Sequence, residues 1–265
     1  MLGQRVASAA IGVPLIILLV AIGGWPYAVA VAVVLAVAVV EFQHLQCDWL
    51  STQSITGAAV VLALVLATEA AGSGPVLASA AISVVGAAAA GGIWIRRYGD
   101  TTLLIAWLAL GVLYVGVLGS TFVLLRNVDN GRDWVYLTLF STFAVDTAAY
   151  FSGRAIGRHK LAPRISPKKT WEGFIGGWAG GFAVAVALNY LLGLRIEARD
   201  IVLIAAVLPL AAAAGDLVES AIKRWTGVKD ASELIPGHGG VLDRLDSLLF
   251  TFPVVYLIAR AVVLS

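Results

Sequence analysis

Residues 220–246, SAIKRWTGVKDASELIPGHGGVLDRLD, separate two segments that are almost purely apolar. The stretch holds nine charged or imidazole side chains and five glycines or prolines. Ionisable groups beside a bilayer are expensive and usually mark a functional site. The pattern therefore indicates a helical membrane protein with a charged, glycine-rich connection between two spans. It also favours carboxylates that bind a metal and cations that bind phosphates.

The composition of the whole chain indicates the same class. Of its 265 residues, 60% are hydrophobic and only 13% are charged, whereas a soluble domain carries roughly 25% charged residues. The mean hydropathy is +0.93. The single cysteine, Cys47, excludes an internal disulfide and a multi-cysteine metal site. We expect an all-α, polytopic integral membrane protein whose first apolar segment is a span and not a cleaved signal peptide.

A helix that crosses the hydrocarbon layer needs about 20 mostly apolar residues. Nine windows of the sequence qualify, so we expect about nine transmembrane helices. The windows cover approximately residues 5–23, 26–45, 54–71, 75–95, 102–125, 134–153, 172–194, 200–222 and 246–264.

The lysines and arginines predict the orientation of these spans. If alternate connections share a side, thirteen of the 18 cations lie on the side of the N-terminus and five on the other. Because excess cations stay cytoplasmic, the charged connections after the sixth and eighth windows are expected to face the cytosol. We predict a multi-pass protein of the cell inner (cytoplasmic) membrane with its active site facing the cytosol.

No linker or internal repeat divides the chain, so residues 1–265 are predicted to form a single membrane domain. Polar groups are nevertheless unevenly distributed along it. Residues 1–125 are mainly hydrophobic, whereas residues 126–265 carry acidic side chains within or near the spans. We therefore expect a mainly hydrophobic helical half followed by a catalytic half.

Two acids lie at the end of the eighth window. Asp216 and Glu219 are three residues apart in an expected helix and therefore share a face. Two carboxylates this close repel each other unless a cation lies between them or one is protonated. Both are candidate metal ligands. Alternatively, Glu219 forms an ion pair with Lys223, four residues further on.

The run PGHGGVLDRLD joins a glycine-rich turn to the last window. Gly239 and Gly240 allow close backbone approach to a ligand, and the following helix start favours an anion such as phosphate. Asp243 and Asp246 again share one expected helical face, although Asp246 also suits a helix N-terminus by its charge alone. Hard oxygen ligands favour Mg²⁺ over zinc. His238 is a candidate catalytic residue or only a hydrogen-bonding partner within the loop.

A third polar run, SPKKTWEG, precedes the seventh window. Thr170 is predicted to cap a helix that has Glu172 in its first turn, and Ser166-Pro167 is expected to form a turn. Adjacent lysines at a membrane surface are most often topogenic or bind anionic lipid. The expected turn and the matching cations after the eighth window favour phosphate binding by Lys168 and Lys169.

Asp146 lies deep in the sixth window and is followed by Thr147 and Tyr150. An ionisable residue inside a span is a functional hypothesis by default. The alternative is a structural hydrogen bond to a neighbouring helix.

The order and spacing of these residues resemble the phosphatidate cytidylyltransferases, also called CDP-diacylglycerol synthases. The resemblance covers roughly residues 140–250 and includes SPKKTWEG and the D-T-x-A-Y pattern that begins at Asp146. Its longest part consists of Ser220, Lys223-Arg224, Lys229-Asp230, Ile235-Pro236, His238-Gly239-Gly240, Asp243-Arg244 and Asp246.

The resemblance implies that CTP and phosphatidic acid react to give CDP-diacylglycerol and pyrophosphate. It implies Mg²⁺ bound mainly by Asp216 and Asp243, with Asp246 and Glu219 as further candidates, and a second cation such as K⁺ is compatible with it. The residues implied in catalysis are Lys223, Arg224, His238 and Arg244. Those implied in substrate binding are Ser166, Lys168, Lys169, Ser220, Lys223, Arg224, Lys229, Gly239, Gly240 and Asp146.

The expected partners are CTP, phosphatidic acid and other membrane lipids, without nucleic acid, and a homodimer is compatible with the resemblance. Two other classes fit less well. A CDP-alcohol phosphotransferase would carry a D-G-x₂-A-R run, which is absent from the sequence. An ion-coupled transporter commonly has repeated halves, and none is evident here.

Overall fold

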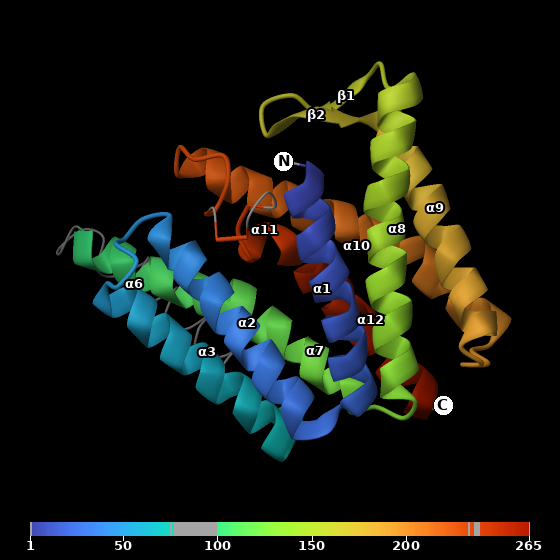
Figure 1. Ribbon diagram of the computed structural model, residues 1–265, viewed down its shortest axis with the longest axis horizontal. Coiled ribbons are helices and arrows are strands. Elements are labelled where there is room, and N and C mark those ends of the chain that lie inside the picture. Colours follow the sequence, from blue (N-terminus) through green and yellow to red (C-terminus); the bar gives the residue numbers. More distant parts are fainter. Residues whose placement is uncertain (1, 75, 77–99, 233, 236–238, 265) are drawn as a thin grey trace. The chain divides into compact units, whose positions relative to one another are not determined.

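The computed structural model describes residues 2–74, 76, 100–232, 234, 235 and 239–264, which are predominantly helical (Figure 1). The chain divides into two compact units. Unit 1 comprises Met1–Asn127 and Asp230–Arg244, and unit 2 comprises Val128–Lys229 and Leu245–Ser265. A boundary between the units therefore falls inside the long charged stretch. Residues 226–229 belong to unit 2, and residues 230–244 belong to unit 1.

Unit 1 is built from a pair of long apolar helices and a segmented one. Its elements are α1 (Leu2–Ile22), α2 (Gly24–His44), α3 (Thr52–Ala71), α6 (Asp100–Gly111), the π-helix η2 (Val112–Val117), α7 (Leu118–Arg126) and most of the short α11 (Leu242–Leu245). The α2 helix packs against α3, and α3 also contacts α6, η2 and α7.

Aromatic stacking and two buried hydrogen bonds secure the core of unit 1. The Phe42 ring stacks on Trp107 with the centroids 4.4 Å apart, and the Trp107 indole N–H donates to the Phe42 carbonyl at 3.2 Å. The Tyr27 hydroxyl donates to the Phe122 carbonyl at 3.3 Å. Because indole and phenol groups need a partner when they are buried, these contacts fix α2 against α6 and α7.

Unit 2 contains the helices α8 (Gly131–Ile156), α9 (Trp171–Leu191), α10 (Ala198–Trp225) and α12 (Leu248–Leu264). The α9 helix packs closely on α8 through glycines at every fourth position, Gly173, Gly177 and Gly181. A Cβ at Gly177 would lie 2.8 Å from the Ala149 Cβ and 2.9 Å from the Val145 carbonyl oxygen. Small residues at this spacing let membrane helices approach to backbone contact.

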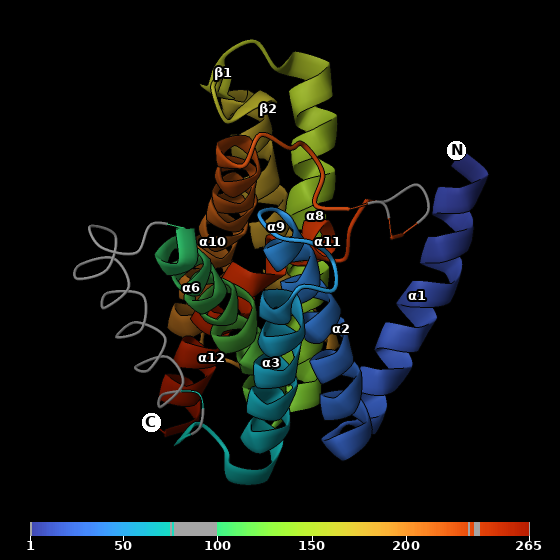
Figure 2. The same cartoon turned by 90° about the vertical axis from the view of Figure 1, so that its left-hand side faces the viewer.

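A two-stranded antiparallel hairpin joins α8 to α9. Its strands are β1 (Lys160–Ala162) and β2 (Ser166–Thr170), with Lys160 opposite Thr170 and Ala162 opposite Ser166. Both views show it at the end of α8 where α9 begins (Figures 1 and 2). The predicted turn at Ser166-Pro167 is wrong. Proline and the residue before it both favour extended backbone, so the chain turns at residues 163–165 instead.

Six helices of the described residues are long and apolar enough to cross a membrane. They are Gly24–His44, Thr52–Ala71, Leu103–Arg126, Trp171–Leu191, Ala198–Trp225 and Leu242–Val262. The third runs through α6, η2 and α7, and the last through α11, a two-residue turn and α12. These match six of the nine predicted windows and confirm a helical, polytopic membrane protein.

The other three predicted windows are not among these six helices, each for a different reason. Window 5–23 lies in α1, whose Gly12–Ile22 part is apolar but shorter. Window 134–153 lies in α8, which is helical but also carries charged and hydroxyl side chains. Window 75–95 falls almost wholly outside the described residues. The count of nine spans therefore stays a prediction.

Candidate active site

The hairpin is attached to the start of α9 by two capping side chains. The Thr170 hydroxyl accepts a hydrogen bond from the Gly173 N–H at 3.1 Å, which confirms the predicted N-cap. The Glu172 carboxylate accepts the backbone N–H groups of Arg158 and His159 at 3.1 and 3.2 Å. The connection from α8 is thereby held against the first turn of α9, and β2 has a defined position.

One lysine of this hairpin reaches an acid of α10. The Lys169 ammonium forms an ion pair with the Asp216 carboxylate, and both side chains are half-buried. The Ser220 hydroxyl donates to the same carboxylate at 3.3 Å. Three residues that the sequence placed in the site therefore meet within unit 2.

A glycine brings Asp216 next to a second acid. A Cβ at Gly215 would overlap the Asp246 carbonyl oxygen and come within 3.0 Å of Phe250. Only a residue without a side chain allows α10 to approach the chain this closely. Asp216, Asp146 and Lys223 all lie within electrostatic reach of the buried Asp246 carboxylate. With Glu219, unit 2 thus gathers four acids and at least two cations near the C-terminal part of α10.

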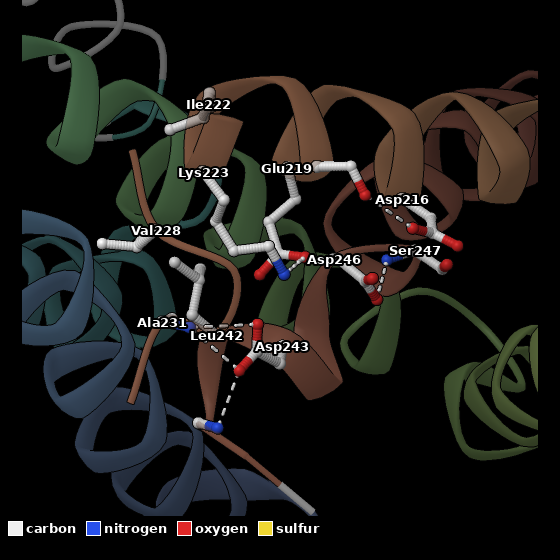
Figure 3. A network of polar contacts seen from close by, with 12 residues as sticks. Asp216, Glu219, Ile222, Lys223, Val228, Ala231, Leu242, Asp243, Asp246 and Ser247 are labelled. Atoms are coloured by element: carbon white, nitrogen blue, oxygen red, sulfur yellow. Dashed lines mark hydrogen bonds and ion pairs between the residues drawn. The ribbon is translucent and has the colours of Figure 1, made fainter. Parts of the chain in front are cut away.

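The continuous helical face predicted for Asp243 and Asp246 is wrong, because the helix is interrupted between α11 and α12. Asp246 and Ser247 form a turn there. The Asp246 carboxylate accepts the Ser247 N–H at 2.7 Å (Figure 3). An aspartate that binds a neighbouring backbone N–H competes with helical hydrogen bonding, which explains the break.

Glu219 lies one turn beyond Asp216 on α10 and forms the ion pair that the sequence allowed. Its carboxylate accepts the Lys223 ammonium at 2.9 Å, and the two side chains are 2% and 11% exposed (Figure 3). Burying two charges is tolerable only when they are paired and hydrogen-bonded. This contact is the structural alternative to metal binding by Glu219, and the metal role stays a prediction.

Further cations of unit 2 lie on the hairpin and at the C-terminal end of α10. Arg224 donates through Nε to the Ile165 carbonyl at the tip of the hairpin, at 3.3 Å, and through NH1 to the Val228 carbonyl at 3.3 Å. Lys168 and Lys229 are exposed, and Ser166 is half-buried at the start of β2. The hairpin and the end of α10 therefore form one cationic surface.

In unit 1, Asp243 organises the glycine-rich run that precedes it. Its carboxylate accepts the Gly240 N–H at 2.8 Å. It also accepts the Ala231 N–H at 3.2 Å (Figure 3). Gly239 has φ +83°, a conformation that favours glycine. Arg244, the next residue after Asp243, is exposed. Such backbone bonds hold the Asp243 carboxylate in one orientation.

The predicted catalytic residue His238 lies outside the described residues. Within the described ranges, no group of three or more histidine, cysteine, aspartate or glutamate side chains is arranged to hold a metal ion. The carboxylate oxygens of Asp216 and Asp246 are of the ligand type that a hard divalent cation prefers.

Glu41, which is fully buried in α2, is not among the residues that the sequence pattern predicts for the site. Its carboxylate accepts hydrogen bonds from the Ser232 hydroxyl at 2.6 Å and from the N–H groups of Val241 and Leu242 at 3.0 and 2.7 Å. A lone acid inside an apolar window is itself a signal of function. Its partners lie about 190 to 200 residues away, which no local pattern reports.

Comparison with known proteins gives consistent matches. A family model described as "Cytidylyltransferase family" matches residues 3–262. A phosphatidate cytidylyltransferase of Bacillus subtilis (strain 168) is 39% identical over 153 residues, or 57% of each chain. Proteins of that name from Staphylococcus haemolyticus (strain JCSC1435) and Brucella suis biovar 1 (strain 1330) are 38% and 42% identical over 56% and 57% of this chain. Each match spans only 56–57% of the relative's own length.

Proposed function

The chain belongs to the cytidylyltransferase family, and from this premise we propose that it transfers the cytidylyl group of CTP to phosphatidic acid. A phosphate oxygen of phosphatidic acid forms a bond to the α-phosphorus of CTP. The bond from that phosphorus to the bridging oxygen breaks, so CDP-diacylglycerol forms and pyrophosphate leaves. Both the acceptor named in the relatives and the membrane helices support this choice of substrate.

The observation that carries the proposal is the pairing of Lys169 on the hairpin with Asp216 on α10. A phosphate bound by Lys169 would lie next to a carboxylate that itself neighbours Asp246. Phosphoryl and nucleotidyl transfer depend mainly on positioning and on neutralising the charge of the phosphates. A phosphate monoester is already anionic at neutral pH, so the reaction requires no strong general base.

The cationic surface of the hairpin and α10 would hold the phosphates. We assign Lys168, Lys169, Lys229 and Arg224 to the CTP or lipid phosphates, with Ser166 and Ser220 as hydroxyl partners. Arginine suits bidentate phosphate contacts, and lysine acts as a point charge. Lys223, Arg244 and His238 remain proposed to act in catalysis. Asp146, Gly239 and Gly240 remain proposed substrate contacts.

We propose Mg²⁺ as the cofactor, with Asp216, Asp243, Asp246 and Glu219 as its candidate ligands. When bound, Mg²⁺ would offset the negative charge that develops on the phosphate oxygens. The close approach of α10 to Asp246 supports a cation in unit 2, because a cation would offset the repulsion between neighbouring carboxylates. A second cation such as K⁺ stays part of the proposal.

The cellular setting is proposed from the distribution of charge. The protein would lie in the cytoplasmic membrane with the hairpin facing the cytosol, because excess cations stay on that side. CTP would then arrive from the cytosol and phosphatidic acid from the bilayer. A homodimer is compatible with this arrangement.

A radiolabelled-CTP assay tests the function. Purified protein in detergent is mixed with phosphatidic acid, Mg²⁺ and CTP labelled in the cytidine, with and without EDTA. We expect EDTA-sensitive label in the lipid phase that Asp243→Asn abolishes, whereas exposed Asp129→Asn, outside the site, leaves it intact.

Other outcomes would redirect the assignment. Label that is insensitive to EDTA would remove Mg²⁺ from the proposal. Folded protein that transfers no label to phosphatidic acid would contradict the function. Transfer of a phosphoalcohol from a CDP-alcohol, or ion-driven uptake without CTP cleavage, would favour the two alternative classes.

A further inference from the structure

Glu41 lies in a position that the proposed reaction does not by itself explain. It belongs to α2, in the apolar first half of the chain, and its side chain has no exposure. A buried carboxylate is costly unless its oxygens are hydrogen-bonded. The fold satisfies it with donors from one distant segment, residues 232–242, which includes part of the glycine-rich run.

The three donors have different roles in that segment. The N–H of Leu242 belongs to the first residue of α11, and the N–H of Val241 lies just before it. A helix of this length leaves its N-terminal N–H groups without intrahelical partners. Glu41 supplies the missing acceptor, and the Ser232 hydroxyl binds the same Oε1 atom as Val241.

Gly240 shows how closely the two segments approach. A Cβ at this position would lie 2.7 Å from Glu41 Oε2 and 3.0 Å from Glu41 Cδ. The absence of a side chain therefore serves the contact with Glu41 as well as any contact with a ligand. The N–H of the same residue points to Asp243. Two carboxylates, Glu41 and Asp243, thus hold consecutive N–H groups of one short run.

We propose that Glu41 is a positioning residue for cytidylyl transfer. Its carboxylate fixes residues 239–243 so that Gly239, Gly240 and Asp243 keep one conformation in unit 1. The inference rests on the proposed function for its effect on turnover. The hydrogen-bond clamp is a property of the fold and can be tested without any substrate.

The test compares Glu41→Gln with Glu69→Gln, the same chemical change at a half-exposed acid of α3 in the same unit. Hydrogen exchange is measured on the peptide that covers residues 239–244. Loss of a hydrogen bond to a charged acceptor raises the equilibrium constant for local opening by about tenfold or more. We therefore expect at least about tenfold faster exchange in Glu41→Gln only.

The kinetic test uses the CTP assay with both variants. A small misplacement of catalytic groups can lower turnover by about 100-fold. We expect kcat to fall at least about tenfold in Glu41→Gln and to remain at the wild-type value in Glu69→Gln. Glu41→Asp, which keeps the charge, should recover part of the loss.

Ser232→Ala provides a milder variant if Glu41→Gln does not fold, because it removes one of the three donors. It should accelerate exchange in the same peptide to a smaller degree. Unchanged exchange in both variants would overturn the clamp, and faster exchange with unchanged kcat would overturn the positioning role. If the wild-type protein does not transfer label, the proposed function fails, and hydrogen exchange still decides the clamp.

Discussion

Lys168 and Lys169 are neighbours on β2 but have different surroundings. Lys168 is exposed, whereas Lys169 is half-buried and pairs with Asp216. Adjacent residues of a strand point to opposite faces, so one lysine faces α10 and the other faces away. From the sequence the two lysines were equivalent candidates, because strand alternation becomes visible only once the hairpin is known.

Replacing each lysine by alanine separates these roles. We expect Lys169→Ala to lower kcat/KM for CTP by at least about tenfold, because it removes a charge from the proposed phosphate site. Lys168→Ala should have a smaller effect, since the side chain is exposed and screened. Steady-state kinetics of the two variants in the labelled-CTP assay check this order. Equal losses would indicate that the pair with Asp216 has no special role.

Asp216→Asn tests the acid of the same pair. We expect kcat to fall by about 100-fold or more, as for removal of one group that stabilises transition-state charge. The melting temperature in detergent should change little, because the half-buried pair contributes modestly to stability. Exposed Asp129→Asn is the matched control. Near-native turnover in Asp216→Asn would exclude it as a metal ligand.

At the scale of elements, the length of the apolar windows predicted the helices. It did not predict the structure of the polar connections between them. Windows of about 20 apolar residues were enough to locate α2, α3, α9 and α10. The hairpin was missed because its strands have three and five residues and mostly polar side chains. The break before α12 was missed because it depends on a side-chain bond from Asp246, not on a proline or glycine.

The close approach of α10 to the turn before α12 in unit 2 gives a stability prediction. A Cβ at Gly215 would overlap the Asp246 carbonyl, so Gly215→Ala must push α10 away from the start of α12. Overpacking of this kind costs about 1–3 kcal/mol. It outweighs the gain of up to about 1 kcal/mol from alanine's higher helix propensity. We expect a lower melting temperature together with reduced turnover.

Gly12→Ala is the matched control for that measurement. Gly12 is also inside a helix, α1, and a Cβ there would meet nothing within 4 Å. Alanine at this position should leave the melting temperature unchanged or raise it slightly. Thermal unfolding of both variants in the same detergent distinguishes overpacking from propensity. A Gly215→Ala protein as stable as Gly12→Ala would contradict the close contact.

At the scale of the whole molecule, the sequence located the polar groups of the second half but not Glu41 in the first. Lys169, Asp216 and Ser220 were predicted as site residues and are in contact. Glu41 escaped because a single sequence does not report which distant N–H groups a buried acid will bind. Tertiary hydrogen bonds across about 200 residues are set by packing, which leaves no local periodicity.

The orientation of the whole chain is the last prediction, and the two connections that flank α9 test it. Exposed Arg158 precedes α9 and exposed Arg199 follows it. If α9 crosses the membrane and excess cations stay cytoplasmic, Arg158→Cys faces the cytosol and Arg199→Cys faces outward. Both are made in a Cys47→Ala background. Burial raises the pKa of the native Cys47 thiol, and its removal leaves one reactive site per variant.

Labelling intact spheroplasts with a membrane-impermeant maleimide reads the orientation directly. We expect Arg199→Cys to react before lysis and Arg158→Cys to react only after it. The reverse pattern would place the hairpin, and with it Lys169, on the outer face, where no cytosolic CTP could reach it. Reaction of both cysteines from one side would mean that α9 does not span the bilayer. In that case the charge distribution would reflect phosphate binding and not topology.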